Sequence, residues 1–383
     1  MSLFVVQSDL LRAVRTAGEI ALKGPTDPQR WIRLFISPDR KSISVMACAG
    51  GMSTCRTVSL KSQPDAAETL DVCVPGERLV AGSRALREGD VKIGLEEGAL
   101  KVEQDGGVSI ELELCNLVEF PGVPDFSKMK QVYVGPNPAP GFEAIKHVAL
   151  TNPGTTPLSA VLIMMNGRSY ISSPTSSVRC DFSLIGVDEV GPVPVVLEST
   201  WVLTHFADQV TCWHETNRIL IIDKDGWATI ALWAGQLAGF PTKIESTFAS
   251  LKQVAQIKVP RADVFRAASA AQVVLKGTTK DAVFLWIETN PEKERITVSA
   301  KIGRHAYKET LVGWSSHSMK VPVHVSRFAE FLRGSDDEAV YVKLMNSELV
   351  QNAQKKFVHF VDSRLHEVVG LPGEYVAEIK ETQ

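Results

Sequence analysis

The sequence predicts an α+β protein made of three tandem copies of one unit, with two helices packed on an antiparallel sheet in each copy. Three observations support this prediction: the same order of strands and helices recurs three times, the period is about 125 residues, and a Phe-Pro pair closes each of the first two copies. Such a repeat divides a chain of 383 residues into several domains. We predict domains at 1–128, 129–252 and 253–365, with a C-terminal tail at 366–383.

Each copy opens with a short strand that runs into an amphipathic helix. The opening strands are predicted at 3–7, 131–135 and 255–260, and the helices that follow begin at Ser8, Pro140 and Arg261. In the first helix, apolar residues recur at helical spacing and Arg12, Arg15 and Glu19 occupy the opposite face. Ser8 is of the type that caps a helix N-terminus.

Two strand pairs and a second helix complete each copy. The first pairs are predicted at 30–37 with 42–49, 158–165 with 168–173, and 282–289 with 295–302. In each copy, the second strand that runs into a helix begins at Val72, Val195 or Val323. The last strand pairs are 91–97 with 99–105, 210–215 with 218–225, and 339–345 with 357–362. Neighbouring units are expected to join their edge strands, and a second chain could pair with the edges left at the two chain ends.

Composition limits the classes of protein that the chain can be. A formal charge of −3 and a pI near 6.3 exclude phosphate neutralisation over the whole surface, so any DNA contact must be local or topological. The six cysteines show no CxxC spacing and lie in strand-like runs, which indicates reduced core residues. No signal peptide and no apolar run of the ~18 residues that span a bilayer are present. We expect a cytoplasmic protein that does not enter a membrane.

No catalytic motif stands out. The sequence lacks GxGxxG, GxxxxGK[ST], GxSxG and HExxH, and its histidines do not have metal-ligand spacing. His214-Glu215 is predicted to form a turn between strands, and the run Asp223-Lys224-Asp225-Gly226 lacks the remaining ligands of a calcium loop. We therefore expect no catalytic residues, no metal and no cofactor.

Two stretches carry a resemblance to a known family. Residues 109–126 read SIELELCNLVEFPGVPDF, and residues 158–180 read LSAVLIMMNGRSYISSPTSSVRC. They resemble the exit of domain 1 and a strand pair of domain 2 in the bacterial DNA polymerase III β subunit, the sliding clamp, and the similarity extends over almost the whole chain. The divergence of the sequence is compatible with a phage or mobile-element origin.

The resemblance implies a DNA-clamp domain in each copy and a homodimer that closes into a ring around double-stranded DNA. Such a protein is a processivity factor: it binds DNA without sequence specificity, docks the DNA polymerase and other replication or repair proteins through short peptide motifs, and is opened by a clamp loader. Two alternatives stay open. One is a clamp-fold scaffold that recruits partners without encircling DNA, and the other is an enzyme with an unrecognised site.

Residue-by-residue transfer from the family gives a partner-peptide pocket. It comprises Leu158, Thr175, Arg179, Pro241 and Val361. Where the family has Thr-Asp-Gly-His-Arg-Leu, residues 175–180 read Thr-Ser-Ser-Val-Arg-Cys, so only the threonine and the arginine are retained. The replaced residues leave open which peptides the pocket accepts, if any.

The resemblance also implies a set of basic residues that face DNA from the helices. They are Arg12, Arg15, Arg84, Lys146, His147, Arg266 and Arg333. A clamp needs a diffuse positive potential, because long-range attraction without tight hydrogen bonds lets the ring slide. The alternative is that these residues only form solvated helix faces, and Glu19, Glu143 and Asp263 dilute their charge.

Apolar residues of domains 1 and 3 are expected at the dimer interface. In the family, the edge of domain 1 pairs with domain 3 of the other chain, which here points to Ile110 and Leu112 on one side and Val273 or Val274 on the other. Strand alternation directs Ile110, Leu112 and Leu114 to one face, so core packing is the alternative and is favoured for Leu114.

The family pattern ends at an Arg-Leu pair that corresponds to Arg364-Leu365, so residues 366–383 are predicted to extend beyond it. The extension is expected to occlude the pocket, to bind a private partner or to be a frayed tail.

Overall fold

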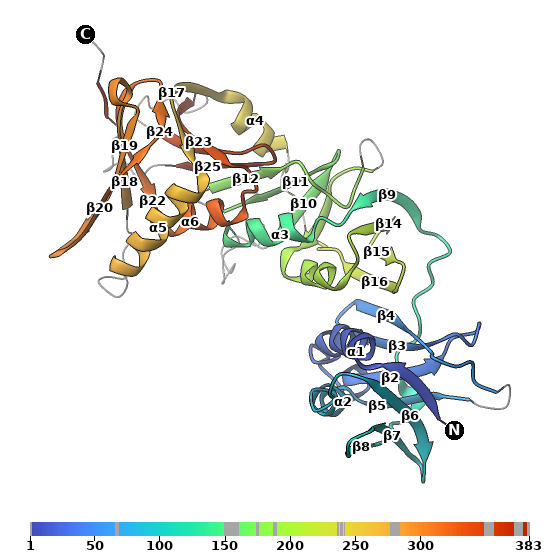
Figure 1. The fold of residues 1–383 in the computed structure, drawn as a ribbon. Coiled ribbons are helices and arrows are strands. Elements are labelled where there is room, and N and C mark those ends of the chain that lie inside the picture. Colours follow the sequence, from blue (N-terminus) through green and yellow to red (C-terminus); the bar gives the residue numbers. More distant parts are fainter. Residues whose placement is uncertain are drawn as a thin grey trace. The chain divides into compact units, whose positions relative to one another are not determined.

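The computed structural model describes residues 2–65, 69–148, 161–173, 176–186, 190–235, 237, 240, 242–275, 284–347, 356–370 and 378–380 (Figure 1). It divides into two compact units. Unit 1 comprises Met1–Asn137 and Ser199–Leu232, and unit 2 comprises Pro138–Glu198 and Trp233–Gln383. Each unit therefore combines one terminal part of the chain with one part of its middle.

Unit 1 contains an eight-stranded and a four-stranded sheet, both antiparallel. The larger sheet has the order β5 (Asp71–Pro75), β2 (Trp31–Ile36), β3 (Ser42–Ala49), β4 (Met52–Ser59), β16 (Gly226–Ala231), β15 (Arg218–Asp223), β14 (Gln209–Glu215) and β9 (Lys130–Pro136). The smaller sheet has the order β1 (Leu3–Val6), β6 (Asp90–Glu96), β7 (Ala99–Gln104) and β8 (Val108–Glu113). The helices are α1 (Gln7–Ala21) and α2 (Gly76–Ser83), with the 3-10 helices η1 (Asp27–Arg30), η2 (Leu117–Glu119) and η5 (Leu197–His205), the last of which begins in unit 2.

Helix α1 follows the predicted amphipathic pattern but begins one residue early. Leu10, Val14 and Ile20 are buried at helical spacing, whereas Arg15 lies on the exposed side. The residue before the helix is Val6, which provides no side-chain cap, so the prediction that Ser8 caps the helix is wrong. Strand β1 passes directly into the helix, and the backbone N–H of the first helical residue donates to the carbonyl oxygen of Gly89 at 3.0 Å.

Unit 2 contains a nine-stranded and a five-stranded sheet, again antiparallel. The larger sheet has the order β13 (Val193–Val196), β10 (Val161–Met165), β11 (Arg168–Ser172), β12 (Ser176–Cys180), β25 (Leu365–Gly370), β24 (Lys356–Val361), β23 (Ala339–Ser347), β17 (Leu251–Pro260) and β21 (Trp314–Ser315). The smaller sheet has the order β20 (His305–Val312), β19 (Arg295–Ile302), β18 (Phe284–Asn290), β22 (Ser318–His324) and β26 (Glu378–Lys380). The helices are α3 (Ala139–Ile145), α4 (Thr242–Ser250), α5 (Arg261–Leu275) and α6 (Val325–Gly334), with the 3-10 helices η3 (Lys146–Val148) and η6 (Pro291–Lys293).

The two large sheets join strands from neighbouring copies of the repeat. Strand β4 pairs with β16, and β12 pairs with β25, in both cases antiparallel. This confirms the expectation that adjacent copies join their edge strands. In the two smaller sheets, β8 and β20 are terminal strands, each with one neighbouring strand among the residues described.

The structure corrects two sequence predictions. The second helix of the middle copy is the 3-10 helix η5 rather than an α-helix. Residues 365–370 form the internal strand β25, so the prediction of a tail that starts at 366 is wrong for this segment. The physical reason is that β25 pairs with a strand on each side, β12 and β24, and buries Leu365, Glu367, Val368 and Val369 in the sheet. The predicted boundary at 252 falls inside β17, and the division into three domains stays a prediction.

Candidate functional site

A row of side chains crosses one face of the nine-stranded sheet in unit 2. Strand pairing places Tyr170 opposite Arg179, Arg179 opposite His366, and His366 opposite Val361. Directly paired residues in antiparallel strands share a face. The opposite face carries Phe360, whose ring stacks on Phe328 of α6 at 4.8 Å. We call the face with Arg179 the α4 face, because Phe248 of α4 packs on it.

The structure brings two of the predicted pocket residues into this row. Arg179 and Val361 lie on strands separated only by β25. Arg179 is largely buried and Val361 is half-buried. The other three predicted pocket residues, Leu158, Thr175 and Pro241, lie outside the described residues.

Phe248 is the centre of a cluster of cationic and imidazole side chains. The guanidinium of Arg179 lies over its ring at 5.1 Å, and the rings of His359 and His366 stand edge-on to it with centroids 5.5 and 6.4 Å away. The two imidazole rings are 5.5 Å apart. We call Phe248, Arg179, His359 and His366 the Phe248 cluster.

A carboxylate from α4 reaches the edge of this cluster. Glu245 accepts a hydrogen bond from the Tyr170 hydroxyl, and its oxygens lie 3.5 Å from Arg179 Nη1 and 3.5 Å from Arg168 Nη1. Its charge is therefore shared among three donors. The pKa of Tyr170 is raised to about 12 by burial and by the neighbouring carboxylate.

Burial keeps the two histidines of the cluster neutral. Burial first, and then the nearby His366 and the positive charges of Lys343 and Arg179, lower the pKa of His359 to about 3. The pKa of His366 is also lowered, first by burial and then by Arg179. Neutral imidazole has one N–H donor and one acceptor nitrogen, so each ring can both give and accept a hydrogen bond.

Sequence reasoning missed His359, His366 and Phe248 as site residues. His359 and His366 occur in FVHFVD and LHEVVG, where each alternates with buried residues, Val358 and Phe360 beside the first and Leu365 and Glu367 beside the second. That alternation places each histidine on the other face of its strand. Which strands pair with one another, and therefore which histidines meet, does not follow from alternation alone.

The predicted DNA-facing residues gather mainly around two cavities. Arg12, Arg15 and Arg84 line a cavity of about 590 Å³ beside α1 and α2 in unit 1. Lys146 and Arg333 line one of about 710 Å³ between α3 and α6 in unit 2.

The remaining two predicted DNA-facing residues lie on α5 and in η3. Arg266 lies on α5, and His147 lies in η3 with a side chain that the structure does not describe.

Most of these basic side chains are exposed but paired with an acid. Arg12 pairs with Asp9 at 3.2 Å, Arg15 with Glu19 at 3.3 Å, and Arg266 with Glu309 at 2.6 Å. Lys146 pairs with Glu143, and Arg333 pairs with Glu330. Exposed pairs of this kind are weak and leave the basic groups available to another anion.

The predicted interface residues differ in exposure. Val273 and Val274 are 74% and 40% exposed near the end of α5, and Ile110 is half-buried on the terminal strand β8. Leu112 is only 4% exposed in the single chain, which favours core packing, the alternative for this residue, and its place at an interface stays a prediction. It lies opposite Leu100 of β7, and Leu114, for which core packing was favoured, is half-buried.

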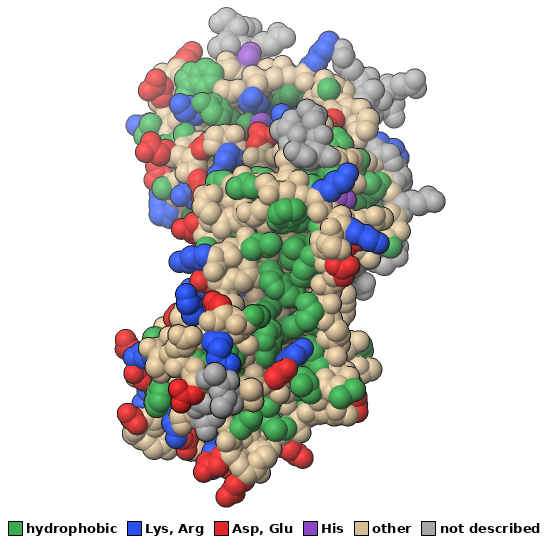
Figure 2. Space-filling model, turned by 90° about the vertical axis from the view of Figure 1, so that its right-hand side faces the viewer, with side chains coloured by type: hydrophobic (Ala, Val, Ile, Leu, Met, Phe, Trp, Pro, Cys, Tyr) green, Lys and Arg blue, Asp and Glu red, His purple; other side chains and the backbone are tan. Residues whose placement is uncertain are grey.

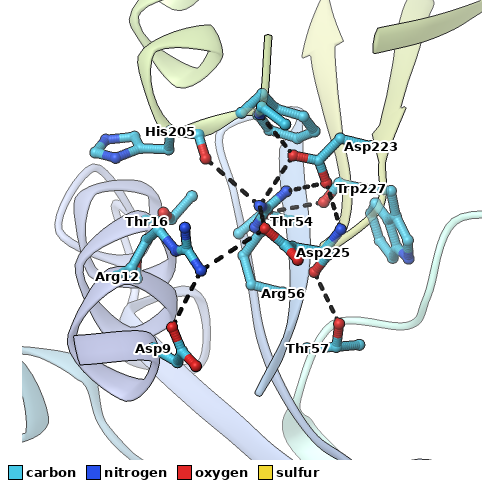
Figure 3. A network of polar contacts seen from close by, with 12 residues as sticks. Asp9, Arg12, Thr16, Thr54, Arg56, Thr57, His205, Asp223, Asp225 and Trp227 are labelled. Atoms are coloured by element: carbon cyan, nitrogen blue, oxygen red, sulfur yellow. Dashed lines mark hydrogen bonds and ion pairs between the residues drawn. The ribbon is translucent and has the colours of Figure 1, made fainter. Parts of the chain in front are cut away.

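The aspartates of the run 223–226 bind an arginine. Asp223 accepts hydrogen bonds at 2.8 and 3.1 Å from Arg56, whose guanidinium also lies 3.8 Å from Asp225 (Figure 3). Backbone N–H groups of Ala207 and Asp225 donate to the same carboxylate at 2.9 Å each. Gly226 has φ 144°, and a Cβ there would lie 2.1 Å from the Cys55 carbonyl oxygen, so glycine is required.

Other candidate sites find no support among the described residues. In this part of the chain, no group of three or more His, Cys, Asp or Glu side chains could hold a metal ion. All six cysteines are free, and burial raises the pKa of Cys48 and Cys73 to about 12. His214-Glu215 belongs to β14, not to a turn as predicted, and no described helix is long and apolar enough to cross a membrane.

The fold is that of known clamp proteins. The DNA polymerase III beta subunit of Thermotoga maritima matches with a TM-score of 0.75 and 11% identity, covering 97% of this chain and 99% of that chain. Sliding clamps from Pseudomonas aeruginosa, in a structure with bound griselimycin, and from Bacillus subtilis each give a TM-score of 0.76, at 14% and 12% identity, with coverage of 97% and 99%. Neither a comparison with protein-family models nor one with curated proteins finds a match. The predicted resemblance is thus confirmed at the level of the fold: this chain has the architecture of the DNA polymerase III beta subunits, the sliding clamps.

Proposed function

We propose that this protein is a DNA polymerase processivity factor, a sliding clamp that two chains close into a ring around double-stranded DNA. The observation that carries the proposal is that each of the two smaller sheets has a terminal strand, β8 in unit 1 and β20 in unit 2, which has one neighbouring strand among the residues described. Open edge strands favour pairing with another chain. A head-to-tail homodimer that joins β8 of each chain to β20 of the other would pair these edges in both chains.

The charge distribution suits a ring that slides. Five of the predicted DNA-facing side chains form only weak pairs with nearby acids, so they stay available to attract phosphate without holding it tightly. On the face shown in Figure 2, basic and acidic side chains are intermingled, in keeping with a net charge of −3. Retention on DNA would then come from topology, with no catalytic step and no cofactor in the clamp itself.

Partner proteins would dock on the α4 face of unit 2. Arg179 and Val361, two residues of the expected pocket, meet there beside the apolar side chains of Phe248 and Phe240. The proposed partners are the DNA polymerase and other replication or repair proteins, each through a short peptide segment, in the cytoplasm. Opening a closed ring would require a clamp loader that uses ATP.

Retention on circular DNA tests the proposal. The protein is assembled with a loader on nicked circular DNA, passed over a sizing column, and assayed again after the circle is cut once. A topological clamp stays with the circle and is lost when the DNA is linearised. Equal retention on both forms would contradict encirclement.

A scaffold that recruits partners without encircling DNA is the second candidate. The acidic partners of the basic helix residues favour it, because they reduce the potential available to DNA. Sedimentation of the full chain at micromolar concentration separates the two candidates. A stable monomer favours the scaffold, and a dimer favours the clamp.

A further inference from the structure

Four of the six cysteines gather on one face of the larger sheet in unit 1. Cys48, Cys55 and Cys73 are buried there in one apolar cluster, and Cys115 packs against it. Two thiols can form a disulfide only when the backbone holds them at a suitable separation. The pairing of the strands therefore determines which of these thiols can react with each other.

Cys73 and Cys115 lie directly opposite each other. They form an isolated antiparallel bridge, in which the backbone N–H of Cys115 donates to the carbonyl oxygen of Cys73 at 2.8 Å. The side chains of such a pair share a face, and the Cα atoms of a hydrogen-bonded pair are about 5.5 Å apart. Disulfides usually join Cα atoms about 4.4–6.8 Å apart. The backbone thus already holds these two cysteines within the range of a disulfide.

The chain around Cys115 can make the small adjustment that an S–S bond requires. Cys115 follows the end of β8 and lies outside the strands, so a bridge rather than a ladder fixes its backbone. The Cβ atoms of an opposed pair are about 4.5–5.5 Å apart, whereas a disulfide brings them to about 3.5–4.5 Å. A shift of about 1 Å at Cys115 closes this gap.

The other two cysteines of the cluster are not opposed to each other. Strand pairing places Cys48 opposite Ser53. It places Cys55 opposite Met46, so the two cysteines are diagonal neighbours in the β3–β4 ladder. Diagonal neighbours are about 7–8 Å apart, which is beyond the usual range of a disulfide. Cys48 and Cys55 therefore share the environment of the pair but not its geometry.

Cys115 is the accessible member of the pair. It is half-buried, whereas Cys73 is fully buried. Burial raises the pKa of Cys73 to about 12, and burial and the charge of Glu113 raise the pKa of Cys115, although Arg78 opposes the second shift. Because the thiolate is the reactive form, both thiols react slowly near neutral pH, and Cys115 is where an oxidant enters.

We propose that Cys73 and Cys115 form a dithiol modification site that a peroxide converts to a disulfide. The Cys115 sulfur attacks one peroxide oxygen, the O–O bond breaks, and a sulfenic acid forms. The Cys73 sulfur then attacks the sulfenic sulfur, the S–O bond breaks, and the S–S bond forms with release of water. In total, two thiols and one hydrogen peroxide give one disulfide and two waters, so sulfur is oxidised and the peroxide oxygens are reduced.

The disulfide joins the two sheets of unit 1. Cys73 lies on β5, the terminal strand of the larger sheet, and Cys115 follows β8, the terminal strand of the smaller sheet. Oxidation therefore ties the end of β8 covalently to the edge of the larger sheet. This chemistry takes place within unit 1 and is independent of the proposed ring.

Oxidation of the reduced full chain tests the site. The protein is incubated with hydrogen peroxide at pH 8, the remaining thiols are alkylated in urea, and the peptides are mapped by mass spectrometry with and without dithiothreitol. We expect the number of free thiols to fall by two from the initial six. A peptide crosslinked between Cys73 and Cys115 should appear, and dithiothreitol should remove it.

Variants connect the crosslink to the opposed pair. Cys115→Ser and Cys73→Ser should each abolish it, because the cysteine that remains has lost its opposed thiol. Cys55→Ser is the matched control from the same cluster and should retain the crosslink. Circular dichroism checks that each variant folds, and the half-buried position of Cys115 makes its serine variant decisive if Cys73→Ser does not fold.

Three outcomes would reject the dithiol site. An unchanged number of free thiols would show that the peroxide does not reach the pair. Conversion of Cys115 to sulfinic acid without a crosslink would show that the two sulfurs do not meet. A crosslink between Cys48 and Cys55, or one that persists in Cys115→Ser, would place the reactive pair elsewhere.

Discussion

Arg56 and Asp223 form the most buried ion pair described in unit 1. Their side chains are 2% and 0% exposed, and the arginine also lies 4.5 Å over the ring of Phe206. Because β4 and β16 belong to neighbouring copies of the repeat, this pair secures the strand junction between them. Buried pairs add little net stability by themselves, but removing one partner leaves an uncompensated charge in the interior.

Asp223→Asn should therefore destabilise the protein by about 3–5 kcal/mol, because the Arg56 charge stays buried without its carboxylate. Urea unfolding measures the loss. The matched control is Asp71→Asn, which breaks another two-bond arginine pair, with Arg33 at 2.7 Å, but on an exposed part of the sheet. That loss should stay below about 1 kcal/mol. Similar losses in the two variants would mean that burial of the first pair does not matter.

His359 should make unit 2 sensitive to acid. Its pKa is lowered to about 3 in the folded state and is near 6.5 in the unfolded chain. Below pH 6.5 the unfolded state binds a proton that the folded state does not, so stability falls as pH falls. From pH 7 to pH 5 this group should cost about 2 kcal/mol. Between pH 7 and pH 5, the free energy of unfolding of the His359→Gln variant, measured in urea, should therefore fall by about 2 kcal/mol less than that of the unmodified protein. Parallel pH profiles of the two proteins would contradict the expectation.

At this scale, only the family resemblance led from the sequence to Arg179 and Val361, which lie on strands separated by β25, and their role in a pocket stays a prediction. His359 and His366 could not be predicted, since their meeting depends on the pairing of β25 with both β24 and β12. The burial of Leu112 in the single chain could not be predicted for a similar reason. Alternation shows that it shares a face with Ile110, but not which helix covers that face.

At the scale of elements, helices were predicted correctly where a single segment has strongly periodic apolar residues. Helices α1, α5 and α6 occur where their apolar spacing predicts them. Strand β25 was missed because the family pattern was taken to end at Arg364-Leu365. That pair instead forms the turn and the first residue of an internal strand, with buried Leu365 paired to Cys180.

Two neighbouring substitutions test the role of β25. Leu365 is 2% exposed and Arg364 has a side chain that is 55% exposed, so Leu365→Ala should cost about 2–5 kcal/mol while Arg364→Ala costs less than about 1. The large value reflects a cavity in the sheet core. Chemical unfolding of both variants provides the measurement. If 365–370 were a frayed tail, the two substitutions would be equally mild.

At the scale of the whole molecule, the order of elements within each copy was predictable, and the connection between copies was predictable only in outline. Local patterns predict strands, whereas the pairings of β4 with β16 and β12 with β25 join residues far apart in the chain. For the same reason, no single motif predicts where a second chain would bind. In the proposed dimer, its contacts are inferred from the free edge strands and from exposed apolar residues.

The valines at the end of α5 make the ring closure testable. Val273 and Val274 are exposed in the single chain, and each would lose water contact in the proposed head-to-tail dimer. Replacing both with serine should weaken each interface by about 3 kcal/mol, and the ring contains two interfaces, so the dimer dissociation constant should increase by more than about ten-thousandfold. Sedimentation equilibrium measures the dissociation constant.

Val118→Ser is the control, because Val118 is 92% exposed but has no predicted role in the interface. An unchanged dissociation constant in the double variant would place the interface elsewhere, and an equal effect of Val118→Ser would show that the loss is not specific to α5.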